Sequence, residues 1–281
     1  MLRSARVTLA LALLAGCDAP APADDAGATR PPETIGPAGR PARLFTPPAH
    51  DGATALPLVV LLHGYTVNAQ LQDLYFGLTR HARRDGYYAL FPDGTIDADG
   101  EPHWDVLGRS VDDHAYLRAR IEEARALVPV ERVFVLGHSN GGFMAYRLAC
   151  DSADLVAGIA SLAGSDAVAD CAPSADVAVL QIHGDADATV AYGGGTIAGL
   201  DYGAADATVA AWAARLGCTG TAEGARLDLV TTLEGAETRV LDHTGCRAGA
   251  SLFTMEGGEH IPSLAPDFTP TVIGWLRAHA R

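Results

Sequence analysis

The chain has 281 residues, 48% hydrophobic and 19% charged, a composition that suits one sizeable globular domain with its own core. Its formal net charge at pH 7 is −14, which argues against a nucleic-acid partner and against a basic, membrane-binding surface. Five cysteines are present, and the first belongs to a predicted targeting segment.

The first segment has the features of an export signal. Arg3 and Arg6 precede a short apolar run, residues 7–14, that is too short to span a bilayer, so residues 1–16 are predicted to be a signal peptide. The sequence LAGC that ends at Cys17 resembles the bacterial lipobox, which implies cleavage before Cys17 and a lipid on its thiol. The alternative is an ordinary signal peptide followed by a chance cysteine. We expect an exported protein, either secreted or attached to the bacterial cell envelope only through the lipid.

Residues 17–39 combine the lipidated cysteine with a stretch rich in Ala, Pro, Asp and Gly that contains almost nothing large and apolar. This composition predicts a disordered tether. Residues 40–281 are then expected to form the catalytic domain.

Within that domain, short apolar runs alternate with helical patterns. This alternation predicts an α/β fold with a mostly parallel central sheet, helices on both faces and no large lid domain. Strands are expected at residues 43–45, 58–62, 87–91, 133–136, 156–162, 177–182 and 250–255, with a polar antiparallel extension at 226–233 and 238–243. Helices are expected at residues 68–84, 111–128, 140–149, 204–216 and 269–280.

Residues 133–144, VFVLGHSNGGFM, join a predicted strand to a predicted helix through a G-x-S-x-G motif centred on Ser139. Because the chain must turn within a few residues, Ser139 is expected in a strained conformation with positive φ. Gly137 and Gly141 avoid the Cβ atoms that would clash where helix and strand meet. Such a turn leaves the hydroxyl exposed, so Ser139 is the candidate nucleophile.

A serine nucleophile needs a base and an acid that orients the base. His260 follows the last predicted strand in a glycine-flanked loop and is the candidate base. For the acid, Asp187 is favoured over Asp185, because the Gly184-x-x-Asp187 spacing gives the chain room to turn toward His260. The order Ser139, Asp187, His260 is the one that α/β-hydrolases use.

Hydrogen-bond donors are also needed for the oxyanion of an acyl-transfer intermediate. We expect them to be the backbone N–H of Asn140 and the backbone N–H of Tyr65, in the sequence His63-Gly64-Tyr65. His63 is expected to support this loop.

Longer motifs carry a family resemblance from about Arg43 to the C-terminus. LLHGYTVNAQ, FPDG, HWDV, VDDHAYLR, GHSNGGFMAYRLAC, SLAG, HGDAD and GGEH together resemble the polyhydroxybutyrate depolymerase and feruloyl esterase-like family of secreted α/β-hydrolases. The resemblance implies hydrolysis of carboxylic esters by the three residues above, and we expect neither a cofactor nor a metal. It also implies that Trp104 lines the substrate pocket, and we assign His63 to substrate binding with it; a packed core aromatic is the alternative for Trp104. Ala191 and Glu259 depart from the family pattern.

Cys150, Cys171, Cys218 and Cys246 remain after Cys17 is assigned to the lipid. In an exported protein, four cysteines suggest two disulfides, and their spacing is not that of a zinc site. The preferred pairing is Cys150–Cys171 with Cys218–Cys246, and the other pairings stay open.

The sequence therefore predicts a monomeric serine esterase for small or oligomeric esters of hydroxyalkanoate or hydroxycinnamoyl type. A serine peptidase or other acyl transferase with the same triad is one alternative. A non-catalytic hydrolase-like surface lipoprotein that only binds its ligand is the other.

Overall fold

The structure, a computed structural model, describes residues 30–280. The predicted signal peptide and Cys17 lie outside the described residues. Within residues 30–280, no helix is both long enough and apolar enough to cross a membrane.

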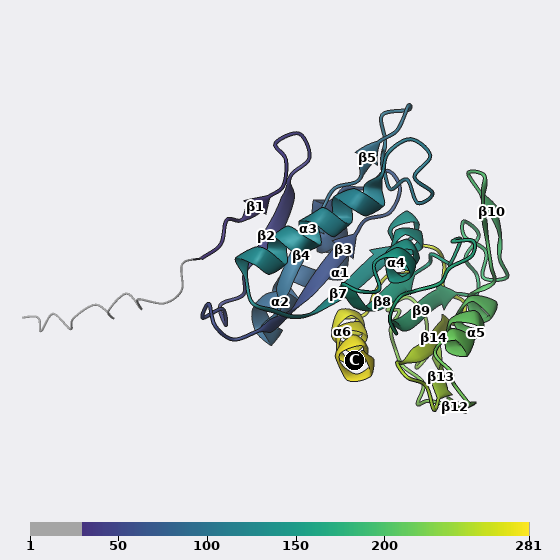
Figure 1. Ribbon diagram of the computed structural model, residues 1–281. Helices are drawn as coiled ribbons and strands as arrows, with labels where there is room; N and C mark the ends of the chain where they lie inside the picture. Colours follow the sequence, from purple (N-terminus) through teal and green to yellow (C-terminus); the bar gives the residue numbers. More distant parts are fainter. Residues whose placement is uncertain (1–29, 281) are drawn as a thin grey trace, which may run out of the picture.

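A ten-stranded sheet forms the centre of the molecule (Figure 1). Every pairing from β4 to β14 is parallel, and the pairings outside these strands are antiparallel. The mostly parallel sheet predicted from the sequence is thus confirmed. The strands, in spatial order, are β1 (Thr34–Ile35), β2 (Ala42–Phe45), β4 (Tyr88–Pro92), β3 (Leu56–Leu62), β7 (Val130–His138), β8 (Val156–Leu162), β9 (Ala178–Gly184), β14 (Ala250–Met255), β13 (Thr238–Thr244) and β12 (Gly220–Glu223).

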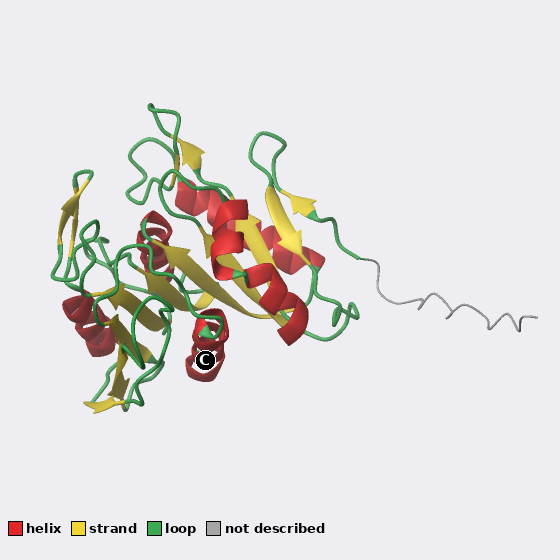
Figure 2. Cartoon of the chain, turned by 180° about the vertical axis from the view of Figure 1, so that it is seen from behind, coloured by secondary structure: helices red, strands yellow, loops and turns green. Residues whose placement is uncertain are grey.

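Helices cover both faces of the sheet, as the view from behind also shows (Figure 2). Side chains of β3 alternate between two core clusters: Val59 and Leu61 lie in one, and Val60 and Leu62 in the other. A strand buried on both faces reads as a continuous apolar run, which is the pattern of β3. The first cluster contains side chains of α1 (Ala69–Phe76), α2 (Leu78–Asp85) and α6 (Phe268–His279), the second those of α3 (Asp113–Leu127) and α4 (Asn140–Asp151), and α5 (Ala205–Arg215) contributes to both.

Two predicted elements differ in the structure. The expected helix at 68–84 is divided into α1 and α2 by Gly77, whose φ of 63° lies in the left-handed region that ends a helix. The expected strand at 226–233 makes only isolated bridges, and β12 takes its place beside β13.

Two hairpins lie outside the central sheet, β5–β6 (Thr95–Ile96 and Pro102–His103) and β10–β11 (Gly195–Ile197 and Leu200–Tyr202). Both extend beyond the same end of the sheet (Figure 1). Their strands are two or three residues long, too short to produce a periodic sequence pattern.

The expected disordered tether ends earlier than residue 39. Ile35 is only 3% exposed and pairs with Ala42, so β1 adds an edge strand to the sheet. The N–H of Gly36 also donates to Oε1 of Glu123 on α3 at 3.2 Å. Placing the start of the folded domain at residue 40 was therefore wrong, because the buried side chain of Ile35 holds the segment before residue 40 against the sheet.

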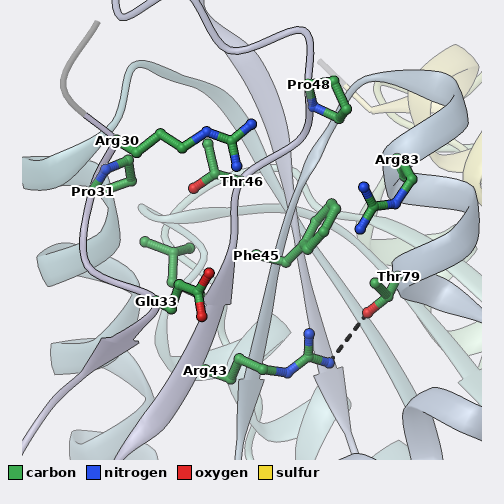
Figure 3. A pocket seen from close by; sticks show the side chains of 10 residues that line it. Arg30, Pro31, Glu33, Arg43, Phe45, Thr46, Pro48, Thr79 and Arg83 are labelled. Carbon is green, nitrogen blue, oxygen red and sulfur yellow. Dashed lines mark hydrogen bonds between the residues drawn. The ribbon is translucent and has the colours of Figure 1, made fainter.

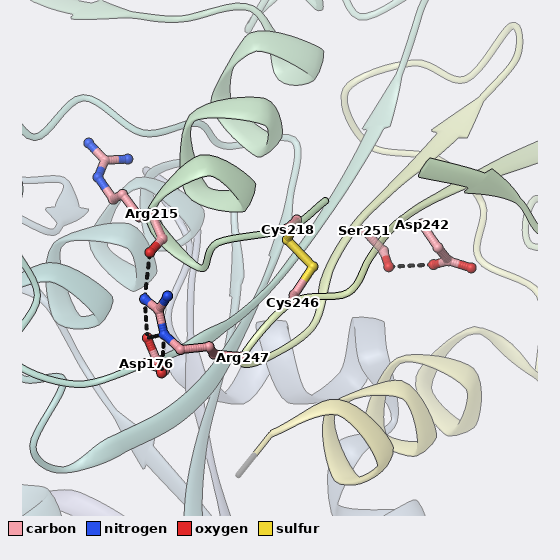
Figure 4. The surroundings of a disulfide bond; sticks show 7 residues. All are labelled: Asp176, Arg215, Cys218, Asp242, Cys246, Arg247 and Ser251. Atoms are coloured by element: carbon pink, nitrogen blue, oxygen red, sulfur yellow. Dashed lines mark hydrogen bonds and ion pairs between the residues drawn. A yellow bond between two sulfur atoms is a disulfide. The ribbon is translucent and has the colours of Figure 1, made fainter. Parts of the chain in front are cut away.

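Both preferred disulfides are confirmed, Cys150–Cys171 and Cys218–Cys246. The first joins the last turn of α4 to the segment before β9. The second joins the end of α5 to the turn between β13 and β14, beside the ion pair of Arg247 with Asp176 (Figure 4).

Candidate active site

The turn between β7 and α4 holds Ser139 at φ 54° and ψ −119°. The expected positive φ is thus confirmed. A Cβ at Gly137 would lie 2.1 Å from the carbonyl oxygen of Gly141, and one at Gly141 would lie 2.3 Å from that of Leu62. Both contacts are shorter than atoms tolerate, so this turn forms only with glycine at these positions.

Three loops bring the predicted triad together at the carboxyl ends of β7, β9 and β14. His260 Nε2 lies 2.9 Å from Ser139 Oγ, and His260 Nδ1 lies 2.8 Å from Asp187 Oδ2. Ser139 is half-buried, and the His260 side chain is 14% exposed. The imidazole of His260 and the hydroxyl of Ser139 are therefore within reach of solvent and of a ligand.

Asp187 is almost fully buried, with 6% of its surface exposed. Its Oδ1 accepts hydrogen bonds from the N–H groups of Thr189 and Val190, at 2.8 and 2.9 Å. Burial raises the pKa of Asp187, but hydrogen bonds from His183 and His260 outweigh it and hold this pKa well below its usual range. The carboxylate therefore stays ionised beside His260.

Asp185, the alternative acid, points elsewhere. Its Oδ1 accepts a hydrogen bond from the N–H of Gly257 at 2.6 Å. This bond joins the loop after β9 to the loop after β14. Asp185 thus fastens the loop that carries His260, and Asp187 is the carboxylate that contacts the imidazole.

The two predicted oxyanion donors lie on segments that meet at Ser139. A Cβ at Gly64 would lie 3.6 Å from Ser139 Cβ, so the His63-Gly64-Tyr65 loop rests against the turn. Among residues 30–280, the N–H groups of Tyr65 and Asn140 donate to no protein acceptor. Both are therefore available to a ligand oxygen.

Trp104 and His63, assigned to substrate binding, are in the core. Trp104 is 1% exposed and donates its Nε1–H to the carbonyl of His63 at 3.0 Å. His63 is fully buried and accepts the N–H of Gly94 at Nε2, and its ring packs against that of Trp104 with 4.9 Å between the ring centres. The substrate assignment was wrong for both, since neither side chain is exposed where a ligand could reach it. They instead support the loop that carries Tyr65.

Sequence reasoning missed the side chain of Asn140. Its Oδ1 accepts the N–H of Trp104 at 2.6 Å, and its Nδ2 donates to the carbonyl of Trp104 at 3.1 Å. The Asn140 amide therefore binds both the N–H and the carbonyl of Trp104. It holds the 93–105 loop next to the backbone N–H of Asn140. The HWDV motif was the only sequence signal that this loop belongs to the site.

His138, directly before Ser139, contacts the loop that carries His260. Its Nε2 lies 3.0 Å from the carbonyl oxygen of His260, and the two rings are 5.3 Å apart. Burial lowers the pKa of His138 to about 4, so the ring is neutral near pH 7. A neutral ring with its proton on Nε2 donates to His260 and ties the two loops together.

The surroundings include two further hollows. A groove of about 950 Å³ runs along α1, lined in part by Leu71, Leu74 and Tyr75, and Tyr75 also contacts the ring of His138. A second hollow of about 420 Å³ lies between β2 and α2, lined by residues that include Arg43 and Arg83 (Figure 3). No triad residue lines either of them.

Comparison with known proteins gives the fold. No family model matches the chain. A segment of 161 residues is 35% identical to the "Putative esterase NocK" of Nocardia uniformis subsp. tsuyamanensis, which covers 53% of this chain and 46% of that protein. The chain thus spans about half the length of this relative.

Solved esterases are similar in structure at low sequence identity. An acetyl xylan esterase from Aspergillus awamori has a TM-score of 0.64 at 13% identity, over 85% of this chain and 94% of that one. A Bacillus cereus carboxylesterase gives 0.54 at 16%, over 86% and 95%. Est1E of Butyrivibrio proteoclasticus with ferulic acid bound gives 0.51 at 15%, over 87% and 96%. These likenesses show that the chain has the α/β-hydrolase fold.

Proposed function

We propose that the protein is a serine carboxylic ester hydrolase, with Ser139 as nucleophile, His260 as base and Asp187 as orienting acid. The observation that carries this proposal is the hydrogen-bonded series Ser139–His260–Asp187, with distances of 2.9 and 2.8 Å. Beside it lie two backbone N–H groups that have no acceptor within residues 30–280. A positioned base and preorganised donors are the requirements of acyl transfer.

In the proposed reaction, Ser139 Oγ attacks the ester carbonyl while His260 Nε2 takes its proton. The N–H groups of Tyr65 and Asn140 bind the oxyanion. His260 then gives the proton to the leaving alcohol, and an ester of Ser139 remains. Water activated by His260 hydrolyses that ester, and Asp187 stays ionised throughout.

For the substrate we propose small or oligomeric esters with an apolar acyl part, of hydroxyalkanoate or hydroxycinnamoyl type. Exposed apolar side chains lie in the segments beside the triad and support this class: Ile261, next to His260, is 65% exposed and Tyr65 is 46% exposed. The names of the similar proteins, an acetyl xylan esterase and a ferulic acid complex, agree with small or aromatic acyl groups.

We also propose that the protein acts outside the cytoplasm as a monomer, secreted or held by a lipid on Cys17. The disulfides Cys150–Cys171 and Cys218–Cys246 support export, because such bonds persist in oxidising compartments. Growth with a labelled fatty acid is expected to label the unaltered protein and not the Cys17→Ala variant. An unaltered protein that takes up no label would contradict the lipid anchor.

Ester hydrolysis tests the proposed reaction directly. p-Nitrophenyl acetate, butyrate and octanoate, methyl ferulate and a 3-hydroxybutyrate oligomer would be compared for the unaltered protein, Ser139→Ala and the exposed-site control Ser174→Ala. We expect Ser139→Ala to lower kcat by roughly 10⁶-fold and Ser174→Ala to leave it unchanged. Turnover that survives in Ser139→Ala would remove Ser139 from the mechanism.

Amide substrates distinguish an esterase from the two alternatives, a peptidase and a binding protein. Each p-nitrophenyl ester would be paired with the p-nitroanilide of the same acid. Serine-dependent cleavage of the anilides at rates near those of the esters would favour a peptidase. A folded protein that binds esters but cleaves neither class would favour the binding lipoprotein.

A further inference from the structure

A series of buried polar side chains continues from Asp187 into the core. Tyr146 on α4 donates its hydroxyl proton to Oε1 of Gln181 on β9 at 2.8 Å. Nε2 of Gln181 lies 2.6 Å from the carbonyl oxygen of Gly164 and 3.0 Å from Nδ1 of His183. Tyr146, Gln181 and His183 are each at most 1% exposed. None of them touches Ser139 or His260, and the mechanism above does not use them.

This series determines which nitrogen of His183 carries the proton. The carbonyl of Gly164 can only accept, so the Gln181 atom that faces it must be the amide nitrogen, which only donates. The same nitrogen faces His183 Nδ1, so Nδ1 must be the acceptor, and the proton of the neutral ring is on Nε2. Burial raises the pKa of Tyr146 well above its usual value, so the first donor stays protonated.

The Nε2–H of His183 is directed at the turn that carries Asp187. Nε2 lies 2.8 Å from the carbonyl oxygen of Val190 and 3.3 Å from Oδ2 of Asp187. The N–H of Val190 donates in turn to Oδ1 of Asp187. The Val190 residue is thus held on one side by His183 and on the other by the carboxylate.

We propose that His183 is a positioning residue of the triad: its Nε2–H fixes the 184–190 turn and faces Oδ2 of Asp187, so that the carboxylate meets His260 in a single orientation. Gln181 and Tyr146 impose the tautomer that this requires. The role rests on the proposed function, since it is a role toward His260. Without His183, Oδ2 would keep His260 as its side-chain donor, and the turn would lose the bond that closes it.

The titratable groups near His183 lie on several elements. Tyr146 approaches through Gln181, with Asp166 acting on Tyr146 in turn, and the ring of Tyr192, on the segment after the turn, lies 5.7 Å from that of His183. Asp187 and, through it, His260 lie on the side of Nε2, whereas Asp185 is directed at Gly257. Asp187 is therefore the negative charge that faces Nε2 of His183.

The first test is independent of activity. Nitrogen-15 NMR of histidine-labelled protein distinguishes the two ring tautomers, and it can be recorded on the unaltered protein and on Ser139→Ala. We expect His183 to have a protonated Nε2 and an unprotonated Nδ1, as its hydrogen-bond partners require. The opposite tautomer would overturn the proposal even in an active esterase. Failure of the esterase assignment would appear separately, as absence of ester turnover.

The second test uses variants. Gln181→Met removes the donor to Nδ1, His183→Leu removes the whole contact, and His183→Gln keeps an amide nitrogen near the place of Nε2. We expect kcat to fall roughly tenfold to hundredfold in His183→Leu and less in Gln181→Met, with little change in KM, because a misplacement of about 1 Å at a reacting group costs up to that much. His183→Gln should recover part of the loss.

A purely structural role predicts a different result. If His183 only stabilises the fold, His183→Leu should have a lower thermal stability and an unchanged kcat, and that result would overturn the proposal. If the variants do not fold, the tautomer of the unaltered protein decides.

Discussion

The reactivity proposed for Ser139 depends on the absence of a Cβ atom at Gly137 and Gly141. Its φ of 54° is tolerated because glycines at 137 and 141 let β7, β3 and α4 approach within contact of backbone oxygens. A serine in an ordinary helix would present its hydroxyl along the helix surface, away from a base on another loop. The proposed role of Ser139 therefore requires this backbone geometry, because the geometry directs the hydroxyl toward His260.

Gly141→Ala tests this geometry. The added Cβ would meet the carbonyl oxygen of Leu62 at 2.3 Å, and a backbone atom cannot move away cheaply. We expect the free energy of unfolding to fall by about 1–3 kcal/mol and kcat to fall with it, measured by denaturant unfolding and ester hydrolysis. Gly274→Ala in α6 is the control, because its Cβ meets no atom within 4 Å. That control should be neutral or stabilising by up to about 1 kcal/mol; equal effects at both sites would contradict the geometric argument.

The Asn140 side chain gives a second prediction for single residues. Asn140→Ala keeps the backbone N–H proposed for the oxyanion but removes both hydrogen bonds to Trp104. We expect kcat to fall about tenfold, equivalent to ~1.4 kcal/mol of transition-state stabilisation, with KM nearly unchanged. Asn140→Asp retains the acceptor for the Trp104 N–H but places an oxygen against the Trp104 carbonyl, so it should not restore activity. Full activity in Asn140→Ala would show that the backbone alone positions this donor.

At the scale of elements, β1 shows how little sequence can fix the edge of a fold. Ile35 is buried and pairs with Ala42, and the backbone carbonyl of Glu33 accepts the N–H of Leu44 at 2.8 Å. A two-residue strand has no periodicity, so composition assigned it to the tether. The same limit explains the missed hairpins β5–β6 and β10–β11.

Shortening the chain measures the contribution of β1. A protein that begins at residue 40 should be less stable than one that begins at residue 30 by about 1.5–3 kcal/mol, the value of burying one large aliphatic side chain. Ile35→Ala in the longer protein should reproduce much of this loss, and Thr34→Ala, at an exposed position, should not. Identical denaturation curves for the two lengths would mean that β1 adds nothing to stability.

The disulfide Cys150–Cys171 connects the element that follows Ser139 to the segment that leads into β9, and therefore toward Asp187. Replacing both cysteines by alanine removes a link across 21 residues of sequence, which should cost about 3 kcal/mol of unfolding free energy. Because α4 is also held by its buried face, we expect kcat at 25 °C to change less than Tm. Replacing Cys218 and Cys246 is the matched comparison; a Tm that is unchanged in both variants would contradict a stabilising role.

Across the whole molecule, patterns that repeat were predictable and single contacts were not. The alternation of apolar runs with helical periods predicted the parallel sheet. Because Ser139, Asp187 and His260 each follow a strand of that sheet, they were expected to meet at one edge. Burial of Trp104 and His63 could not be read in the same way, because a loop residue has no period that tells which side it faces. The tautomer of His183 depends on Gln181 in the same strand and on Tyr146 in α4, and no sequence pattern around His183 predicts these contacts.

Buried neutral histidines give the molecule a predictable response to pH. Burial lowers the pKa of His138 from 6.5 to about 4, and it also lowers the pKa values of His63, His81 and His114. Between pH 4 and 6.5, His138 binds a proton in the unfolded chain but not in the folded chain. The free energy of unfolding therefore rises with pH in this range, and stability is lost as pH falls from about 6.5 toward 4. For His138 alone the loss by pH 4 is about 3 kcal/mol.

Denaturant unfolding between pH 7.5 and 4.5 would measure this loss. His138→Gln keeps a side-chain amide donor and cannot titrate, so its unfolding free energy should depend less steeply on pH than that of the unaltered protein. Asp187 acts in a different window, because its lowered pKa adds stability that is lost only as pH falls below about 4, the range of an unfolded carboxyl group. An equally steep dependence in His138→Gln would assign the acid sensitivity to the other histidines whose pKa is lowered. A flat profile in the unaltered protein would contradict the lowered pKa of His138.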